Sequence, residues 1–396
     1  MKQLVLNNVD IFDTETLQMR PESKVIIRGN LIVEVTKASM TSKADERDGV
    51  VIDGKGSTVL PGLIDCHTHL FYDSLPERFE NTPESSSFLT AIAVTSLRMH
   101  LEAGVTTVRD CGSPHDLAVG LSQAQREGLI PGPRVLPAGR MLTMTGGHGS
   151  QIGRLVDGVD SAILQTRQAL SKGADFIKLM ATGGIVTKGV QPGQTALMPE
   201  ELGAIVRTAH HAGKKVTAHA TGLEGARNAV EAGVDSLEHG VELDESLCQR
   251  MVQSGTMLVP TLSATNQLLA KADLLPEWMK EKALRAWGNH ERSFRTAHEA
   301  GVRLAAGTDG GTPYNPHGSI AQEMALLVSL GLTPAEALSS ATKGSAQAVG
   351  MDSQIGSITE GLIADLIMVK GDPTADIHAL NKPECVIQNG TISYTR

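Results

Sequence analysis

From residue 59 onward, short apolar runs alternate with longer amphipathic segments. The apolar runs lie near 59–66, 104–110, 134–139, 175–180, 215–220, 235–239, 256–261 and 302–308. The amphipathic segments between them, which have the period of surface helices, include 89–103, 161–172, 199–212, 223–232 and 242–254. Short strands that alternate with helices are typical of a parallel sheet. Eight such units predict an α/β fold, a (β/α)8 TIM-like barrel over residues 59–348.

Three connections repeat the phrase Glu-Ala-Gly-Val, at 102–105, 231–234 and 299–302. Each predicts a helix that ends just before a glycine with left-handed backbone, followed by a strand. The repeat shows that these β/α units share one type of connecting loop, and it does not indicate a solenoid.

Both ends of the chain have a different pattern. Short β-like runs occur near 2–7, 24–29, 31–36 and 50–52, and again at 364–370 and 384–394. Turn signals such as Asn389-Gly390 separate them. We predict that residues 1–58 and 349–396 are the two halves of one small β-sandwich domain, with the metal-binding barrel inserted between them.

Composition narrows the class of partner. An apolar fraction of 41% supports a large core, and a net charge of −9 argues against nucleic acid or an anionic membrane. The four cysteines are widely spaced and form no CxxC pair, so a reducing compartment fits better than a disulfide framework. The first residues lack the pattern of a secretory signal. We expect a cytoplasmic homo-oligomer that acts on a small molecule.

The most informative residues are His67 and His69, which follow the apolar run 59–66. Residues two apart on a strand share a face, so both imidazoles point the same way. Two protonated imidazoles repel each other, whereas a metal ion binds both in their neutral form. Four further residues of chemical interest lie at or just past the end of a predicted strand, each followed closely by small residues: Lys178, His219, His239 and Asp309.

On a barrel, these strand ends meet at one rim, where barrel enzymes place their sites. Four imidazoles and a carboxylate suit a zinc-like divalent cation. Lys178 is the exception, because metals would repel an ammonium group. It must therefore be neutral or modified, and a carbamate formed with carbon dioxide would be anionic and able to bridge two ions.

The chain resembles the amidohydrolase superfamily over essentially its whole length. The resemblance rests on residues 61–69 (PGLIDCHTH) and 361–366 (GLIADL). Within that superfamily, residues 177–184 (IKLMATGG), 145–149 (TGGHG) and 218–220 (AHA) resemble the binuclear Xaa-Pro and Xaa-Arg dipeptidases, a prolidase-like subgroup often labelled imidazolonepropionase-like. True imidazolonepropionases lack the bridging lysine, so Lys178 counts against that activity.

This resemblance implies two divalent metal ions, which we expect to be zinc. One would take His67, His69, carboxylated Lys178 and Asp309, and the other Lys178, His219 and His239. It implies hydrolysis of an amide bond through a metal-bridging hydroxide, with Asp309 as the proton-transfer group. His148 lies in the Gly-rich stretch 145–149, which suggests backbone approach to a site, and we assign it to the oxyanion.

Residues that hold the substrate are expected on the loops that follow the strands. Lys188 or Arg140 would pair with a substrate carboxylate. The full set of candidates is Tyr72, Arg140, Lys188, Gln191, Gln194, Tyr314 and His317.

Three functions are considered for this chain. The favoured one is hydrolysis of a dipeptide or an N-acyl amino acid. The second is hydrolysis of a non-peptide amide, carbamate, urea or cyclic amide, with arylester or phosphotriester turnover as a side activity. The third, a binding protein on a catalytically dead barrel, conflicts with an intact ligand set. Gly183-Gly184 belongs to no phosphate-binding pattern and is interpreted as an open turn at the site.

Overall fold

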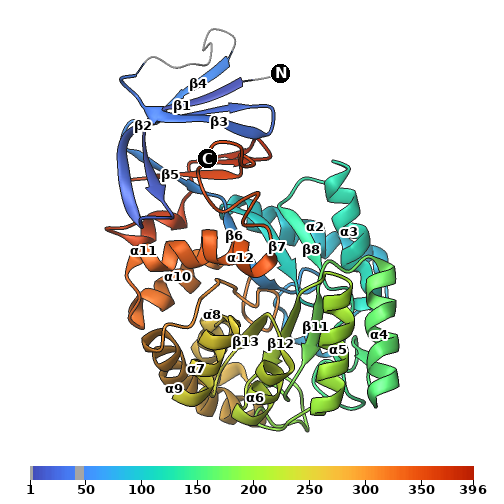
Figure 1. Ribbon diagram of the computed structural model, residues 1–396. Helices are drawn as coiled ribbons and strands as arrows, with labels where there is room; N and C mark the ends of the chain where they lie inside the picture. Colours follow the sequence, from blue (N-terminus) through green and yellow to red (C-terminus); the bar gives the residue numbers. More distant parts are fainter. Residues whose placement is uncertain (1–2, 41–48) are drawn as a thin grey trace.

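The computed structural model describes residues 3–40 and 49–396 and shows a mixed α/β protein (Figure 1). Parallel strands surrounded by helices form the larger part of the molecule. A sheet built from the two ends of the chain lies beside it. Residues 1–2 and 41–48 of the predicted N-terminal half lie outside the described residues.

The end sheet has eight strands: β1 (Gln3–Asp13), β2 (Gln18–Arg28), β3 (Leu31–Lys37), β4 (Gly49–Asp53), β5 (Ser57–Pro61), β15 (Leu366–Lys370), β16 (Cys385–Gln388) and β17 (Thr391–Thr395). Strand β5 joins the two ends of the chain, because it pairs in parallel with β1 and antiparallel with β15. The pairings define one mixed sheet within the described residues, and they do not show the facing pair of sheets that a sandwich requires.

The predicted strand at 59–66 is in fact two strands that belong to different sheets. The end sheet takes β5, and the first parallel strand is β6 (Leu63–Thr68). Gly62 lies between them and donates its N–H to the Asp365 carbonyl at 2.7 Å. A Cβ at this position would lie 2.2 Å from the Thr106 hydroxyl oxygen, so only glycine permits this close crossing.

The parallel strands fall into two sheets, β6-β7-β8 and β10-β9-β11-β12-β13-β14. Beyond β6, their bounds are β7 (Val105–Asp110), β8 (Arg134–Pro137), β9 (Leu142–Thr143), β10 (Arg154–Leu155), β11 (Ile177–Met180), β12 (Val216–Ala220), β13 (Ser236–His239) and β14 (Met257–Val259). The predicted eighth strand, 302–308, forms only an isolated bridge, Leu258 to Leu304, and a second bridge joins Thr68 to Gly310. The pairings among described residues therefore do not close a barrel.

Most helices lie against the parallel strands (Figure 1). They are α1 (Pro76–Glu80), α2 (Ser86–Glu102), α3 (Leu117–Arg126), α4 (Val159–Lys172), α5 (Pro199–His211), α6 (Leu223–Ala232), α7 (Glu245–Ser254), α8 (Leu262–Ala270), α9 (Glu277–Glu299), α10 (Ile320–Ser329), α11 (Pro334–Ser339) and α12 (Ser345–Val349). The glycines of the repeated phrase, Gly104, Gly233 and Gly301, have φ of 85°, 93° and 80°, the left-handed backbone that was predicted.

The main apolar cores lie where helices pack on the strands. All four cysteines are buried and free. None of the helices in the described ranges is long and apolar enough to traverse a lipid bilayer.

Asp365 connects the end sheet to the parallel strands. It is 3% exposed, and one of its carboxylate oxygens accepts from the Arg134 guanidinium at 2.8 Å. The other accepts from the Asn389 N–H at 2.7 Å. This single side chain therefore links β8 to the turn between β16 and β17.

We predict that Asp365→Ala lowers the free energy of unfolding by about 3–5 kcal/mol, because it leaves the Arg134 charge without its partner in a mostly buried place. Urea denaturation of both proteins measures the difference. Glu102→Ala is the matched control. It removes an exposed pair with Arg98, 3.6 Å apart, and should cost less than about 0.5 kcal/mol. Equal effects of the two variants would show that the Asp365 link contributes nothing.

Candidate metal centre

The six residues selected from strand ends lie around one cavity of about 490 Å³. His67 belongs to β6 and His69 follows it. Lys178, His219 and His239 belong to β11, β12 and β13, and Asp309 follows the segment 302–308. The parallel register brings them together, since Met180 pairs with His219 and Ala220 with His239.

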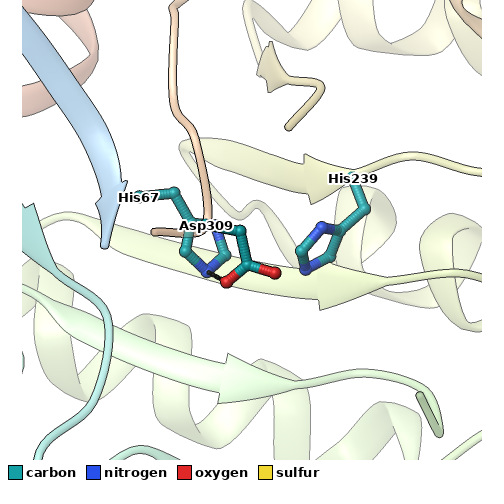
Figure 2. A group of neighbouring side chains, drawn as sticks. All are labelled: His67, His239 and Asp309. Atoms are coloured by element: carbon teal, nitrogen blue, oxygen red, sulfur yellow. Dashed lines mark ion pairs between the residues drawn. The ribbon is translucent and has the colours of Figure 1, made fainter. Parts of the chain in front are cut away.

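Asp309 is the carboxylate that faces the Nε2 atoms of the first two histidines. Its Oδ1 lies 3.4 Å from His67 Nε2 and 3.2 Å from His69 Nε2. Figure 2 shows His67, His239 and Asp309 converging, and their potential ligand atoms lie within 4.8 Å of one another. The His239 ring also contacts that of His219, with a centroid distance of 4.6 Å. This spacing suits a group of metal ligands.

The backbone is strained at three places around this cavity. His239, Thr261 and Asp309 have φ of 68°, 50° and 57°, the left-handed region that side chains other than glycine rarely adopt. Asp309 is held there because its N–H donates to the His67 carbonyl at 2.7 Å. Its own carbonyl accepts from the Asn315 side-chain amide at 2.9 Å. Such strain is typical of functional sites, where the surrounding structure fixes the geometry.

Each of the four histidines uses one ring nitrogen in a hydrogen bond to the protein. His67 Nδ1 contacts Glu238 Oε2 at 2.7 Å, and His69 Nδ1 contacts the Gly112 carbonyl at 3.2 Å. The other two contacts are His219 Nε2 to the Gly183 carbonyl at 2.9 Å and His239 Nδ1 to Thr261 Oγ1 at 2.6 Å. The second nitrogen of each ring is left for the cavity. Metal-binding histidines have this arrangement, because the outer hydrogen bond fixes the tautomer and the ring.

Glu238 is fully buried and is neutralised by Arg109, whose guanidinium donates to its Oε1 at 2.7 Å. The same carboxylate oxygen accepts from Ser236 Oγ at 3.1 Å and from the Thr217 hydroxyl. Glu238 points into the interior of the strands, where it meets Arg109, whereas His239 ends β13 with a left-handed backbone and lines the cavity. An anion is thereby held behind His67.

Lys178 is 1% exposed, and its Nζ lies 3.5 Å from His67 Nε2. No carboxylate of the described residues lies within ion-pair distance of this amine. A buried positive charge without a partner is costly. Carboxylation of the amine would turn that charge into a negative one, which the surrounding imidazoles and a metal would stabilise.

Burial makes three of the imidazoles poor bases. It holds the pKa of His67, His219 and His239 well below the ordinary value, and nearby positive groups such as Lys178 add to this effect. For His69, burial is the largest single cause and acts to lower the pKa, but the hydrogen bond to Asp309 and the negative charges of Asp309 and Asp110 together outweigh it, so the pKa is raised. Neutral imidazoles with one free nitrogen, together with a carboxylate, fit a divalent cation such as zinc.

His148 lies in the same cavity, on the loop that follows β9. Its Nδ1 contacts Thr187 Oγ1 at 2.6 Å, and its ring centroid lies 4.6 Å from that of His219. A Cβ on Gly184 would lie 2.7 Å from this ring, so glycine lets the loop after β11 press against it. Burial is the main cause that lowers the pKa of His148 to about 3.

Of the predicted substrate contacts, the structure brings Tyr72 and Lys188 to the cavity. The buried Tyr72 hydroxyl bonds Thr82 Oγ1 at 2.9 Å, whereas the Lys188 side chain is exposed.

The remaining predicted contacts do not lie along the cavity wall. Arg140 donates to the Ile152 carbonyl at 2.8 Å and so holds its own loop. His317 is buried between His100 and the Tyr72 carbonyl, bonded to them at 3.0 and 2.8 Å. Tyr314 packs on the apolar cluster around Leu268, and Gln191 and Gln194 are exposed. Other contacts or solvent occupy these side chains, so the structure does not bring them to the cavity, and their contacts with substrate stay predictions.

Sequence reasoning missed Glu238, Arg109 and Thr187. A signal existed for the first two, since each is a charged residue within an otherwise strand-like run that ends at the rim. Thr187 had none, because a threonine in a Gly-rich loop has no distinguishing spacing.

Comparison with known proteins agrees with the motifs. The profile described as the amidohydrolase family matches residues 58–392. The ochratoxinase of Aspergillus niger is 30% identical over 363 residues, which cover 83% of this chain and 73% of the fungal protein.

Two solved structures cover 100% of this chain and 100% of their own length. One is a Xaa-Pro dipeptidase with bound methionine in its active site, with a TM-score of 0.91 and 31% identity. The other is a prolidase complexed with N-methylphosphonate-L-proline, with a TM-score of 0.89 and 30% identity. The resemblance to Xaa-Pro dipeptidases that the motifs indicated is confirmed.

We predict that Glu238→Gln weakens retention of divalent metal roughly 10- to 100-fold, because His67 loses the anion that orients its ring. Competition with a chelator, followed by elemental analysis, measures the change. Glu201→Gln is the control: this side chain is 7% exposed and caps helix α5, where it accepts from the Met198 N–H at 2.7 Å. Unchanged retention in Glu238→Gln would reject the role of the outer carboxylate.

Proposed function

This chain belongs to the amidohydrolase family, and we propose that it is a metal-dependent hydrolase that cleaves the amide bond of a dipeptide or an N-acyl amino acid. One observation carries the proposal: four imidazoles, a buried lysine without a counter-ion and a carboxylate line one cavity. Similarity to a Xaa-Pro dipeptidase over the whole chain supports the choice of an amide between amino acids.

The cavity residues divide into two groups of ligands. We assign His67, His69 and Asp309 to one ion and His219 and His239 to a second. Lys178, carboxylated, would serve both. When bound, divalent ions of this kind lower the pKa of water and polarise a carbonyl group. We propose zinc, because imidazole-rich sites with few oxygen ligands suit it.

The protein's own groups move the protons and position the substrate. In the proposal, Asp309 takes a proton from the attacking water and returns it to the leaving nitrogen. His148 donates from Nε2 to the oxygen of the scissile carbonyl. Lys188, an exposed cation at the cavity, pairs with the carboxylate of the C-terminal amino acid, and Tyr72 forms part of the wall.

A second candidate is hydrolysis of a non-peptide amide, carbamate, urea or cyclic amide. The observation that favours it is the apolar part of the cavity, which includes Phe79, Leu268 and Trp278. Such a wall accepts an aromatic or branched group that need not be an amino acid side chain. Similarity to the Aspergillus ochratoxinase named above also supports this second candidate.

We also propose that segment 302–309 completes an eight-membered parallel barrel with the seven strands β6, β7, β8, β11, β12, β13 and β14. Two isolated bridges support this closure. Leu304 pairs with Leu258 of β14 on one side, and Gly310 pairs with Thr68 of β6 on the other.

The first test is metal content together with a substrate screen. Protein expressed with added zinc should carry close to two ions per chain by elemental analysis. It should hydrolyse N-acyl amino acids or dipeptides faster than carbamates and ureas of matched size. A stoichiometry near one would remove the bridging role of Lys178. Preference for the carbamates or ureas would favour the second candidate.

The second test concerns Asp309. We predict that Asp309→Asn lowers kcat about 10²- to 10⁴-fold with a much smaller change in KM, because the amide cannot take up the proton. Steady-state kinetics at matched metal content measures both constants, and elemental analysis of the variant is the control. A variant with full kcat whenever its metal is restored would limit Asp309 to a ligand role.

A further inference from the structure

Thr187 is the hydrogen-bonding partner of His148, and the geometry of the pair bears on which nitrogen of that ring carries the proton. The contact between Thr187 Oγ1 and His148 Nδ1 is 2.6 Å. A neutral imidazole has one N–H and one bare nitrogen, so this contact has two forms. Either the hydroxyl donates to a bare Nδ1, or the ring donates to the hydroxyl oxygen.

The surroundings of Thr187 favour the first form. The Thr187 hydroxyl makes no other hydrogen bond within the described residues. Its proton therefore has His148 Nδ1 as its acceptor among those residues. If the ring donated instead, the hydroxyl proton would have no protein acceptor, which is unfavourable in a partly buried group. With the hydroxyl donating, the ring proton stays on Nε2. That nitrogen accepts no hydrogen bond from the described residues, and His148 lines the cavity.

Lys282 holds the loop that carries Thr187. This lysine belongs to α9 and is 5% exposed. Its Nζ donates to the Thr187 carbonyl at 2.8 Å and to the Val190 carbonyl at 2.5 Å, and it lies 5.0 Å from the centre of the Trp278 ring. No carboxylate in the ranges 3–40 and 49–396 pairs with it. Its charge is therefore stabilised by the loop carbonyls and the aromatic ring.

Apolar contacts fix the same loop against the same helix. Ile185 and Val186 pack on the cluster of Leu268, Met279 and Ala283, which joins α8 to α9. Gly184 lies against the His148 ring on the other side of the loop. The segment 184–190 is thus fixed between His148 and α9, and Thr187 stands between the two.

We propose that Thr187 and Lys282 are positioning residues that fix the tautomer and orientation of His148, so that Nε2–H faces the substrate carbonyl. The proposal rests on the proposed function, in which His148 donates to that carbonyl. Lys282 acts on Thr187, and Thr187 acts on His148. Neither residue touches the reacting atoms in this scheme.

The direct test is the protonation state of the ring in the wild-type protein. Zinc-loaded protein labelled with ¹⁵N-histidine gives two-bond ¹H–¹⁵N correlations, in which a bare nitrogen resonates far downfield of a protonated one. His148 is identified by the signals that vanish in His148→Ala. We expect a bare Nδ1 and a protonated Nε2. A protonated Nδ1 in the wild-type protein would overturn the proposal, even if no amide substrate is turned over.

The kinetic test compares Thr187→Val with Thr187→Ser. Valine has the shape of threonine without the hydroxyl, so kcat on an amide substrate should fall roughly 10- to 1,000-fold, at most as far as in His148→Ala. KM and metal content should stay nearly unchanged. Serine keeps the hydroxyl and should restore most of the loss. Wild-type kcat in Thr187→Val, or an equal loss in both variants, would contradict the role of the hydroxyl.

A double variant separates positioning from a general effect on the fold. If Thr187 acts through His148, adding Thr187→Val to His148→Ala should lower kcat no further. Losses that multiply would show that Thr187 acts independently and would overturn the proposal. A wild-type protein inactive on every amide would instead remove the proposed function, and the NMR result would still decide the tautomer.

Lys282→Met tests the outer link. The two carbonyls lose their donor, so the loop should shift, raising KM several-fold and lowering kcat less than Thr187→Val does. Lys280→Met on the same helix is the control, because the Lys280 amine makes no hydrogen bond or ion pair within the described residues. Identical kinetics for the two lysine variants would overturn the role given to Lys282.

Discussion

The arrangement around the cavity depends on hydrogen bonds that hold each imidazole in one tautomer. A carboxylate, two backbone carbonyls and two hydroxyls contact one nitrogen on each of five rings, those of His67, His69, His219, His239 and His148. In every case, the second nitrogen is left for the cavity. A ring without such a partner would rotate and exchange its proton between nitrogens, and its lone pair would have no fixed direction.

This requirement places polar groups where a parallel fold ordinarily has apolar ones. Glu238, Arg109 and Thr217 are buried among the strands, and the Arg109 guanidinium and the Thr217 hydroxyl both donate to the Glu238 carboxylate. Each alone would be costly in that position, but together they satisfy their donors and acceptors. Asp65 is a further case: burial raises its pKa to about 7, although the hydroxyl and N–H of Thr308 both bond it. The interior beneath the cavity is therefore a hydrogen-bonded network that supports the rim.

The loops contribute through a second layer of contacts. The loop after β11 brings Gly184 against His148, Thr187 to its Nδ1 and Lys188 to the cavity mouth. Helix α9 fixes that loop through Lys282 and adds Trp278 to the cavity wall. One helix and one loop thus both hold His148 and form part of the cavity wall, so the proposed function would link substrate specificity to the orientation of His148.

The sequence by itself determined the alternation of strands and helices, and it singled out the six strand-end residues that line the cavity. Both follow from local periodicity and from the rule that parallel strands present their carboxyl ends at one rim. Only the tertiary structure decided which residues stand behind them, because Glu238, Arg109 and Thr187 take their roles from neighbours far away in the chain. It also decided that the run 59–66 divides at Gly62 and that Arg140 and His317 hold loops. Those outcomes depend on packing between distant segments, which a pattern along one chain does not contain.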